Sequence, residues 1–211
     1  MSASPGLHLF PENAFEHAVR RGVRIAVRRL DGERPRSWLA DLGCLPSWLL
    51  VGHAAHHEVE RCCGRALALF ERHALLDGLW LVRVGQARYL LGVEPDSAWS
   101  WTSAPALATA VPVTLPTESA QFALGGTVAE EILRELCTFD PMPLAQPGSY
   151  VPLLIAQHEA VLLREADGFI LRAAAADAHS LGSALAAALI ARGGALIGYD
   201  DYQRPRSGAP S

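Results

Sequence analysis

The densest group of residues that could bind a metal ion lies in one short segment, HAAHHEVERCC at residues 53–63. If this segment is a helix, its histidines stand three and four residues apart, a spacing that a transition metal can use. The zinc-protease pattern HExxH is absent, because Arg61 stands where its second histidine would be. A solvated helix start with acidic residues is the simpler interpretation. We therefore assign no metal site. The residues that could bind a metal ion are His53, His56, His57, Cys62 and Cys63.

The remaining reactive side chains do not form a pattern typical of catalysis. Cys137 closes an amphipathic segment, and a thiolate is disfavoured at the C-terminal end of a helix, so we expect a buried structural thiol. His158 and His179 are expected at the surface. The nucleophile pattern GxSxG and the phosphate-binding patterns GxxxxGK and GxGxxG are all missing. The sequence thus predicts no catalytic and no cofactor-binding residue.

Two tryptophans, Trp99 and Trp101, stand two residues apart in a stretch of small and polar residues. Such tryptophans suit a protein interface. Packing onto the chain's own core is an equally good explanation. Both residues are kept as interface candidates.

Composition narrows the class of protein. Of the 211 residues, 50% are hydrophobic and 19% are charged, which is typical of a globular chain. The formal net charge of −4 predicts no general attraction to nucleic acid. We find no basic segment followed by an apolar run at the start and no apolar run strong enough for a bilayer span. The expectation is a cytoplasmic protein without a membrane segment.

Hydrophobic periodicity places the elements that would carry these residues. In the first half it predicts a helical piece over 11–21, a strand over 22–30, a short helix or turn over 34–46, a helix over 53–76 and a hairpin over 77–95. In the second half it predicts a strand over 117–126, a helix over 125–137, three strands over 150–173, a helix after Asp177 and a last strand over 195–202.

Local signals support the ends of the second-half helices. Thr127 and Glu130 have the spacing of a capping box. Asp177 is expected to cap the following helix, which Gly193 and Gly194 would end.

This order of elements predicts an α+β fold with two lobes, each an antiparallel sheet with helices packed on one face. Parallel crossovers do not fit, because three strands follow each other closely. We place an N-terminal lead at 1–20, the first lobe at 21–103, the second lobe at 104–202 and a disordered tail at 203–211.

The ordered segments from Leu115 to Leu189 resemble the gamma subunit of heterotetrameric sarcosine oxidase and the small subunit of methylglutamate dehydrogenase. The resemblance rests on "AQFALGG", "TVAEEILRELCTFDPMPL", "QPGSYVPLLIAQ", "EAVLLREADGFILRA" and "DAHSLGSALAAAL", and upstream on "LADLGCLP" and "LWLVRVGQARYLL". The usual "GPDEW" hairpin of that family here reads "RVGQARY", as in a divergent member.

The resemblance implies an aminomethyltransferase-like fold of two ferredoxin-like lobes. It further implies a noncatalytic structural subunit of a flavin-dependent amine oxidase or dehydrogenase that acts on secondary amines such as sarcosine. Larger flavoprotein subunits would be its partners. FAD, FMN, NAD and tetrahydrofolate would be bound by those subunits and not by this chain.

Two alternatives stay open. A free-standing folate-dependent one-carbon transferase of the same fold would need a buried carboxylate, for which Asp140 and Glu118 are the nearest candidates. A metal-binding protein would use the segment from His53 to Cys63.

Overall fold

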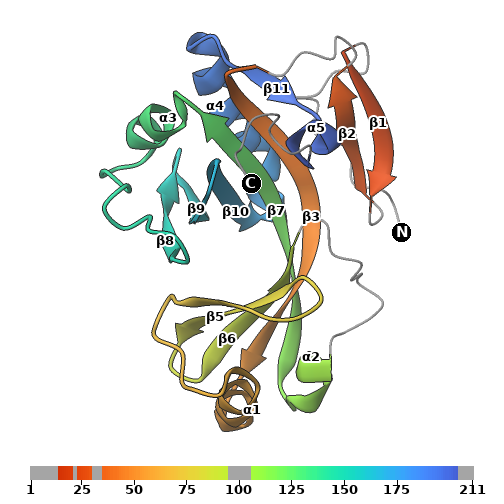
Figure 1. The fold of residues 1–211 in the computed structure, drawn as a ribbon, viewed down its shortest axis with the longest axis vertical. Coiled ribbons are helices and arrows are strands. Elements are labelled where there is room, and N and C mark those ends of the chain that lie inside the picture. The colour runs from red at the N-terminus through yellow and green to blue at the C-terminus, as the bar shows by residue number, and fades with distance from the viewer. Residues whose placement is uncertain (1–13, 21–22, 30–34, 95–105, 204–211) are drawn as a thin grey trace, which may run out of the picture.

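A single large sheet organises the chain, as the computed structural model shows (Figure 1). The structure describes residues 14–20, 23–29, 35–94 and 106–203. The sheet has nine strands in the order β4-β5-β6-β3-β7-β10-β9-β8, and β11 pairs with β3. All of its neighbouring strands are antiparallel except β11 and β3, which are parallel. The strands of this sheet are β3 (Ser37–Val51), β4 (Arg72–Ala74), β5 (Leu79–Gly85), β6 (Arg88–Val93), β7 (Thr114–Gly126), β8 (Tyr150–Ile155), β9 (His158–Glu165), β10 (Gly168–Ala174) and β11 (Ala195–Ile197).

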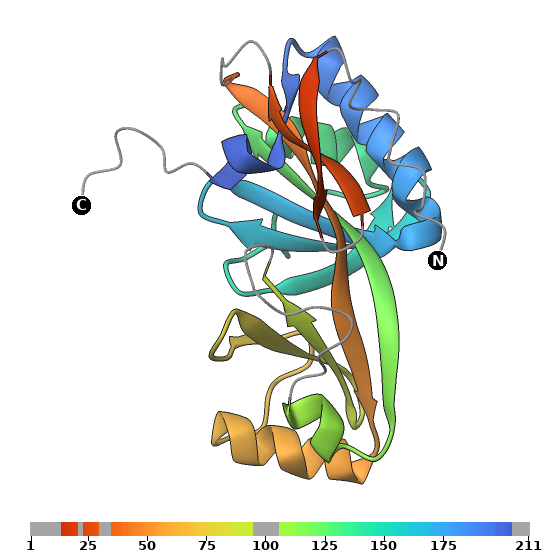
Figure 2. The same ribbon diagram turned by 90° about the vertical axis from the view of Figure 1, so that its right-hand side faces the viewer.

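Helices cover parts of this sheet, and a small second sheet lies beside it (Figures 1 and 2). The second sheet is the antiparallel pair of β1 (Phe15–Arg20) and β2 (Val23–Arg29). The α+β class and the predominantly antiparallel pairing are confirmed. The helices are α1 (His53–Cys63), α2 (Ala106–Ala110), α3 (Ala129–Leu136), α4 (Ala178–Ala191), which follows the 3-10 turn Ala175–Asp177, and α5 (Tyr199–Gln203).

The long strands β3 and β7 pair along most of their length and extend from one end of the molecule to the other (Figure 1). The small lobe consists of residues 45–51 of β3, α1, β4, β5, β6, α2 and the first residues of β7. The large lobe contains the other described elements. Each lobe has its own apolar core, and the core of the small lobe comprises Leu45, Trp48, Leu50, Ala55, Val59, Leu67, Leu81, Tyr89, Leu91, Val93, Ala108 and Val111. The predicted boundary at residues 103 and 104 involves a segment outside the described residues and stays a prediction.

Alternation along the strands of the large lobe separates two faces of the sheet. Phe169 and Leu171 of β10 pack into the core beneath α3 and α4. Ile170 packs into a different cluster with Trp38 and Trp80 on the opposite face. Figure 2 shows α4 covering one face of the large lobe only. The opposite face is therefore free to turn toward the small lobe.

Strand β3 replaces the helix or turn predicted over 34–46, which is a correction. Gly43 and Pro46 look like helix-ending residues, yet both lie inside the strand. Strand β3 pairs with β11 at residues 38–40 and with β6 at 47–51, so in between it is bonded along one edge, to β7. A proline and the bulge between Asp41 and Gly43 are tolerated there, because no described strand pairs with the other edge of β3 at these residues.

Two predicted helices of the first half are also corrected. Residues 15–20 form β1 and not a helix, because pairing with β2 overrides local helix propensity. The helix predicted over 53–76 ends at Cys63, where Gly64 adopts a left-handed conformation with φ of 70°. Leu69 and Phe70, which lie inside the range predicted as helical, follow the end of α1 and are exposed.

The second half follows the prediction more closely. The three strands predicted over 150–173 are present as β8, β9 and β10. The capping box is wrong: α3 begins at Ala129 without a side-chain cap, and the hydroxyl of Thr127 contacts the hydroxyl of Ser37 at 3.1 Å. Asp177 precedes α4 but does not cap it. The last predicted strand is divided into β11 and α5.

Within the described residues, none of the helices combines the length and apolar character needed to span a bilayer.

Candidate functional site

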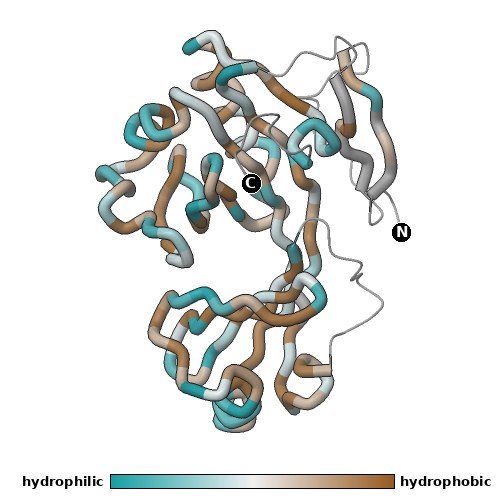
Figure 3. Tube along the Cα trace, in the orientation of Figure 1, coloured by the Kyte–Doolittle hydropathy of each residue, from teal (hydrophilic) through white to brown (hydrophobic). Residues whose placement is uncertain are grey.

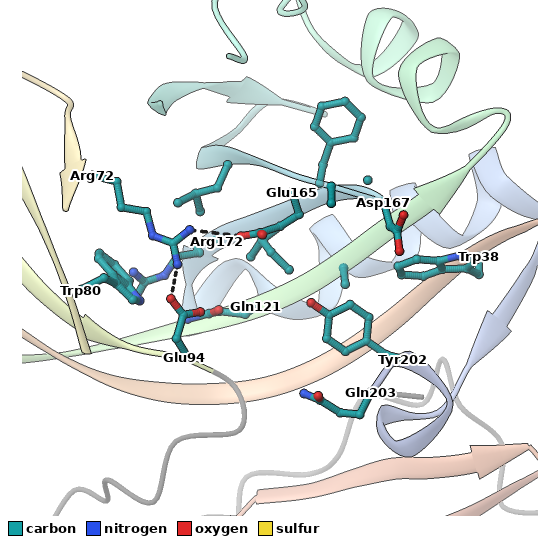
Figure 4. Close-up of a pocket in the computed structure, with 16 residues that line it drawn as sticks. Trp38, Arg72, Trp80, Glu94, Gln121, Glu165, Asp167, Arg172, Tyr202 and Gln203 are labelled. Atoms are coloured by element: carbon teal, nitrogen blue, oxygen red, sulfur yellow. Dashed lines mark hydrogen bonds and ion pairs between the residues drawn. The ribbon is translucent and has the colours of Figure 1, made fainter. Parts of the chain in front are cut away.

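The uncovered face of the large lobe and the edge of the small lobe enclose a pocket of about 310 Å³ (Figure 4). Strands β7, β9 and β10 supply its floor, β4 and β5 supply one wall, and α5 supplies the other. Both polar and aromatic side chains line it. Those that matter most for its chemistry are Trp38, Arg72, Trp80, Glu94, Gln121, Glu165, Asp167, Arg172 and Tyr202.

Arg172 is the most unusual residue of this pocket. It lies on β10 among apolar neighbours, and its side chain is only 4% exposed. One guanidinium nitrogen, Nη2, donates a hydrogen bond to Oγ of Ser119 at 2.7 Å, and the guanidinium carbon lies 4.5 Å from the ring centre of Trp80. Burial lowers the pKa of Arg172 to about 10. A charged group is thus held where its charge is poorly solvated.

Several buried nitrogens here have no hydrogen-bond partner among the described residues. They are Nε and Nη1 of Arg172, Nε2 of Gln121 and Nε of Arg72. Gln121 stands directly opposite Arg172 in the pairing of β7 with β10, so the two side chains lie side by side on one face of the sheet. Buried donors are normally paired, so this group marks a place where acceptors are missing.

Arg72 connects the two lobes at the mouth of the pocket (Figure 4). From β4 of the small lobe it pairs with Glu94 and, at 3.1 Å, with Glu165 at the end of β9 in the large lobe. Its guanidinium carbon lies 5.6 Å from the ring centre of Trp80. Trp80 is thus contacted by Arg72 as well as by Arg172. The contact fixes the small lobe over the pocket.

A second pocket of about 700 Å³ opens on the other side of Arg172, between the lobes. It is more open and its lining is mainly apolar, with Leu90, Tyr150 and Leu153 among its residues. Phe139 and Leu154 also line it and are 44% and 41% exposed. This pocket has the character of a groove between surfaces more than of an enclosed site.

The structure disperses the predicted metal candidates along α1, which is largely hydrophilic (Figure 3). Both ring nitrogens of His56 already have partners within the protein: Nδ1 lies 2.6 Å from the Tyr89 hydroxyl, and Nε2 lies 3.3 Å from a carboxylate oxygen of Glu60. The others are exposed or half-buried: His53, His57, Cys62 and Cys63. No group of three or more potential metal ligands occurs within the described ranges.

The remaining candidates lie away from the pocket. Cys137 is buried at the end of α3, and burial raises its pKa to about 11, as expected of a structural thiol. Asp140 is exposed and bonds to Arg134 and to the amide of Met142. Glu118 belongs to β7, opposite Pro46. Trp99 and Trp101 fall outside the described residues.

Sequence reasoning missed Arg172 and Gln121. The one available signal was alternation: Arg172 follows GFIL in a strand, and Gln121 interrupts the apolar residues of AQFAL. Period two puts both on the face opposite Phe122 and Leu171. That face looked solvent-exposed, because the sequence does not reveal that the small lobe folds over it.

We expect that Arg172→Met raises the free energy of unfolding by about 1–2 kcal/mol. The lowered pKa corresponds to a burial cost of about 3 kcal/mol, and the lost hydrogen bond and cation–π contact offset part of the gain. Urea denaturation at pH 7 measures the change. Arg88→Met, at an exposed arginine of β6, is the control and should change little. A lower stability of Arg172→Met would contradict this account.

Gly92→Ala should displace the Trp80 ring from the pocket wall. A Cβ at Gly92 would lie 2.1 Å from Cζ2 of Trp80, so the ring must move. Overpacking of this kind costs about 1–3 kcal/mol. Gly85→Ala is the matched control, since its nearest neighbour would be Cβ of Arg88 at an ordinary 3.5 Å. Denaturation and tryptophan emission distinguish the two, and equal behaviour would contradict the prediction.

Comparison with solved structures places this fold beside two enzymes. One chain of the heterotetrameric sarcosine oxidase from Corynebacterium sp. U-96, solved in complex with pyrrole 2-carboxylate, superposes with a TM-score of 0.55 and 18% identity over 71% of this chain and 82% of its own. Glycine cleavage system aminomethyltransferase T from Bartonella henselae superposes with a TM-score of 0.67 and 16% identity over 92% of this chain. The match spans 58% of the transferase. No protein-family model and no curated protein sequence matches. The similarity therefore establishes the aminomethyltransferase-like fold.

Proposed function

We propose that this chain is a noncatalytic structural subunit of a multi-subunit flavin-dependent oxidase or dehydrogenase that acts on secondary amines such as sarcosine. The observation that carries the proposal is the match to a chain of a heterotetrameric sarcosine oxidase over 82% of that chain's length. Because the match takes up 71% of this chain, the two chains are of similar size. FAD, FMN, NAD and tetrahydrofolate would then be bound by larger partner subunits.

Exposed apolar side chains support the proposal that another subunit covers part of this chain. The open groove of about 700 Å³ is mainly apolar, and Phe139 and Leu154 at its rim are exposed. Leu76 in the small lobe is 85% exposed. Large apolar side chains gathered at an open groove are typical of surfaces that another chain covers.

Co-purification tests the proposal. The full chain carrying an affinity tag is isolated from its native cells, and bound proteins and chromophores are identified by mass spectrometry and absorbance. We expect flavoprotein subunits in a fixed ratio to the tagged chain, and none with the tag alone. A stable monomer isolated without any partner or flavin would contradict the proposal.

A free-standing folate-dependent one-carbon transferase is the second candidate. It is favoured by the higher TM-score of 0.67 to aminomethyltransferase T and by a pocket lined by the carboxylates of Glu165 and Asp167. Asp140 lies in a surface loop and so is a poor choice for the required carboxylate. Titration with tetrahydrofolate, followed by protein fluorescence, tests this candidate. The absence of a saturable change would remove it.

A further inference from the structure

We propose that the pocket at Arg172 binds a small monocarboxylate with a flat, apolar body, held through Arg172 and Gln121. This inference does not depend on the proposed function, because a ligand site in this chain is compatible with either role.

The need for an anion comes from the unpartnered donors. Arg172 is buried, and two of its three guanidinium nitrogens have no hydrogen-bond partner among the described residues. Gln121 is 3% exposed, and its Nε2 also has no hydrogen-bond partner among the described residues. None of the pocket carboxylates accepts a hydrogen bond from these three nitrogens, and Glu94 and Glu165 pair with Arg72 instead. A carboxylate has two oxygens that accept from a guanidinium and a neighbouring amide together.

The aromatic side chains on the walls of the pocket indicate the shape of the ligand. Trp80 lies over Arg172, and on the opposite wall Trp38 and Tyr202 pack with ring centres 5.7 Å apart (Figure 4). Ala123, Leu163 and Ile170, which share one apolar cluster with Trp38 and Trp80, complete the apolar part of the lining. Space of about 310 Å³ between aromatic surfaces suits a compact planar body.

The acidic residues around the pocket limit the negative charge that a ligand can carry. Glu94, Glu165 and Asp167 line the pocket, so three carboxylates lie close to the space that a ligand would occupy. A second negative charge on the ligand would face these acids and be repelled. A single carboxylate, directed inward to Arg172, avoids them.

Trp80 should report the binding. The unpartnered nitrogens each expose less than 1 Å², so an incoming carboxylate reaches them only if the covering ring shifts. Such a shift changes the surroundings of the indole and hence its fluorescence. Gly92, which packs beneath the ring, leaves no room for the shift in that direction.

The experiment titrates the full chain, in the assembly in which it is purified, with four probes. Benzoate has the ring and one charge, benzamide has no charge, phthalate has two charges, and acetate has no ring. Tryptophan fluorescence and calorimetry should show saturable binding of benzoate. Each of the other three should bind at least tenfold more weakly. Equal binding of benzoate and benzamide, or no saturation with benzoate, would overturn the proposal.

Two variants test the assignment of the donors. Gln121→Glu places a carboxylate beside Arg172 and should weaken benzoate binding at least tenfold by pairing with the guanidinium. Arg172→Met should abolish benzoate binding. Gln86→Glu, the same change at an exposed glutamine of the β5–β6 turn, controls for added negative charge and should bind benzoate normally. Unchanged affinity in both Gln121→Glu and Arg172→Met would show that benzoate binds elsewhere.

Discussion

The free energy of unfolding should fall by about 3 kcal/mol between pH 4 and pH 7 through one residue, Asp41, and Asp41→Asn should remove this fall. Asp41 is 5% exposed, and its carboxylate accepts the amide hydrogen of Gly43 at 2.8 Å. Burial raises its pKa from 3.8 to about 6, and the hydrogen bond from Gly43 lowers it only in part.

The sign follows from proton binding. With the higher pKa in the folded state, the folded protein keeps the proton of Asp41 at pH values where the unfolded chain has lost it. The stability from this group is fully present below about pH 4 and is lost as the pH rises through about 6. A difference of about two pKa units corresponds to about 3 kcal/mol.

Urea denaturation at pH 4, 5, 6 and 7 measures the effect as the difference between parent and Asp41→Asn, which cancels the contribution of other titrating groups. Asp77→Asn, in the exposed turn before β5, is the matched control and should follow the parent. Parallel pH profiles of the parent and Asp41→Asn would contradict the prediction.

Gly126→Ala should destabilise the protein by about 3 kcal/mol or more. Gly126 has a φ of 91°, and a Cβ there would lie 2.0 Å from the carbonyl oxygen of Arg36 and 2.5 Å from Cα of Ser37. Both atoms belong to the backbone, so no side-chain rotation relieves the contact. The pairing of β7 with the start of β3 must open instead.

Gly64→Ala is the control that separates backbone strain at a positive φ from steric overlap of the added Cβ. Gly64 has a similar φ of 70° with nothing within 4 Å of the added Cβ, so its replacement should cost about 1 kcal/mol. The excess in Gly126→Ala measures the steric contact with Arg36 and Ser37. Thermal and urea denaturation give both values. Equal losses in the two variants would refute the steric explanation.

Prediction from sequence succeeds where pattern and pairing are local. The β5–β6 hairpin and the strands β8, β9 and β10 pair with their neighbours in the chain, so alternation and turn residues suffice to find them. Helix α4 also lies where a helix was predicted, directly after Asp177, and its residues Leu181, Leu185 and Leu189 are buried. These elements carried most of the correct fold class.

Prediction fails where the local structure depends on contacts with segments far away in the sequence. Strand β3 is a strand because β7 pairs with it from more than 60 residues away, as in the pair of Leu50 with Thr114. Nothing near Gly43 or Pro46 indicates this partner. The pocket was missed for the same reason: Arg172 and Trp80 meet only after the lobes fold together.

The path of β3 and β7 bears on the order in which the chain folds during synthesis. The chain leaves the large lobe along β3, completes the small-lobe core between Leu45 and Val111, and returns along β7. The small lobe is thus a continuous segment that emerges whole from the ribosome, whereas the start of β3 must wait for the end of β7. We expect nascent chains arrested after residue 120, with linker enough to clear the ribosome, to protect Leu81 and Leu91 but not Leu39 from hydrogen exchange. Protection of all three at that length would show that the lobes do not fold in this order.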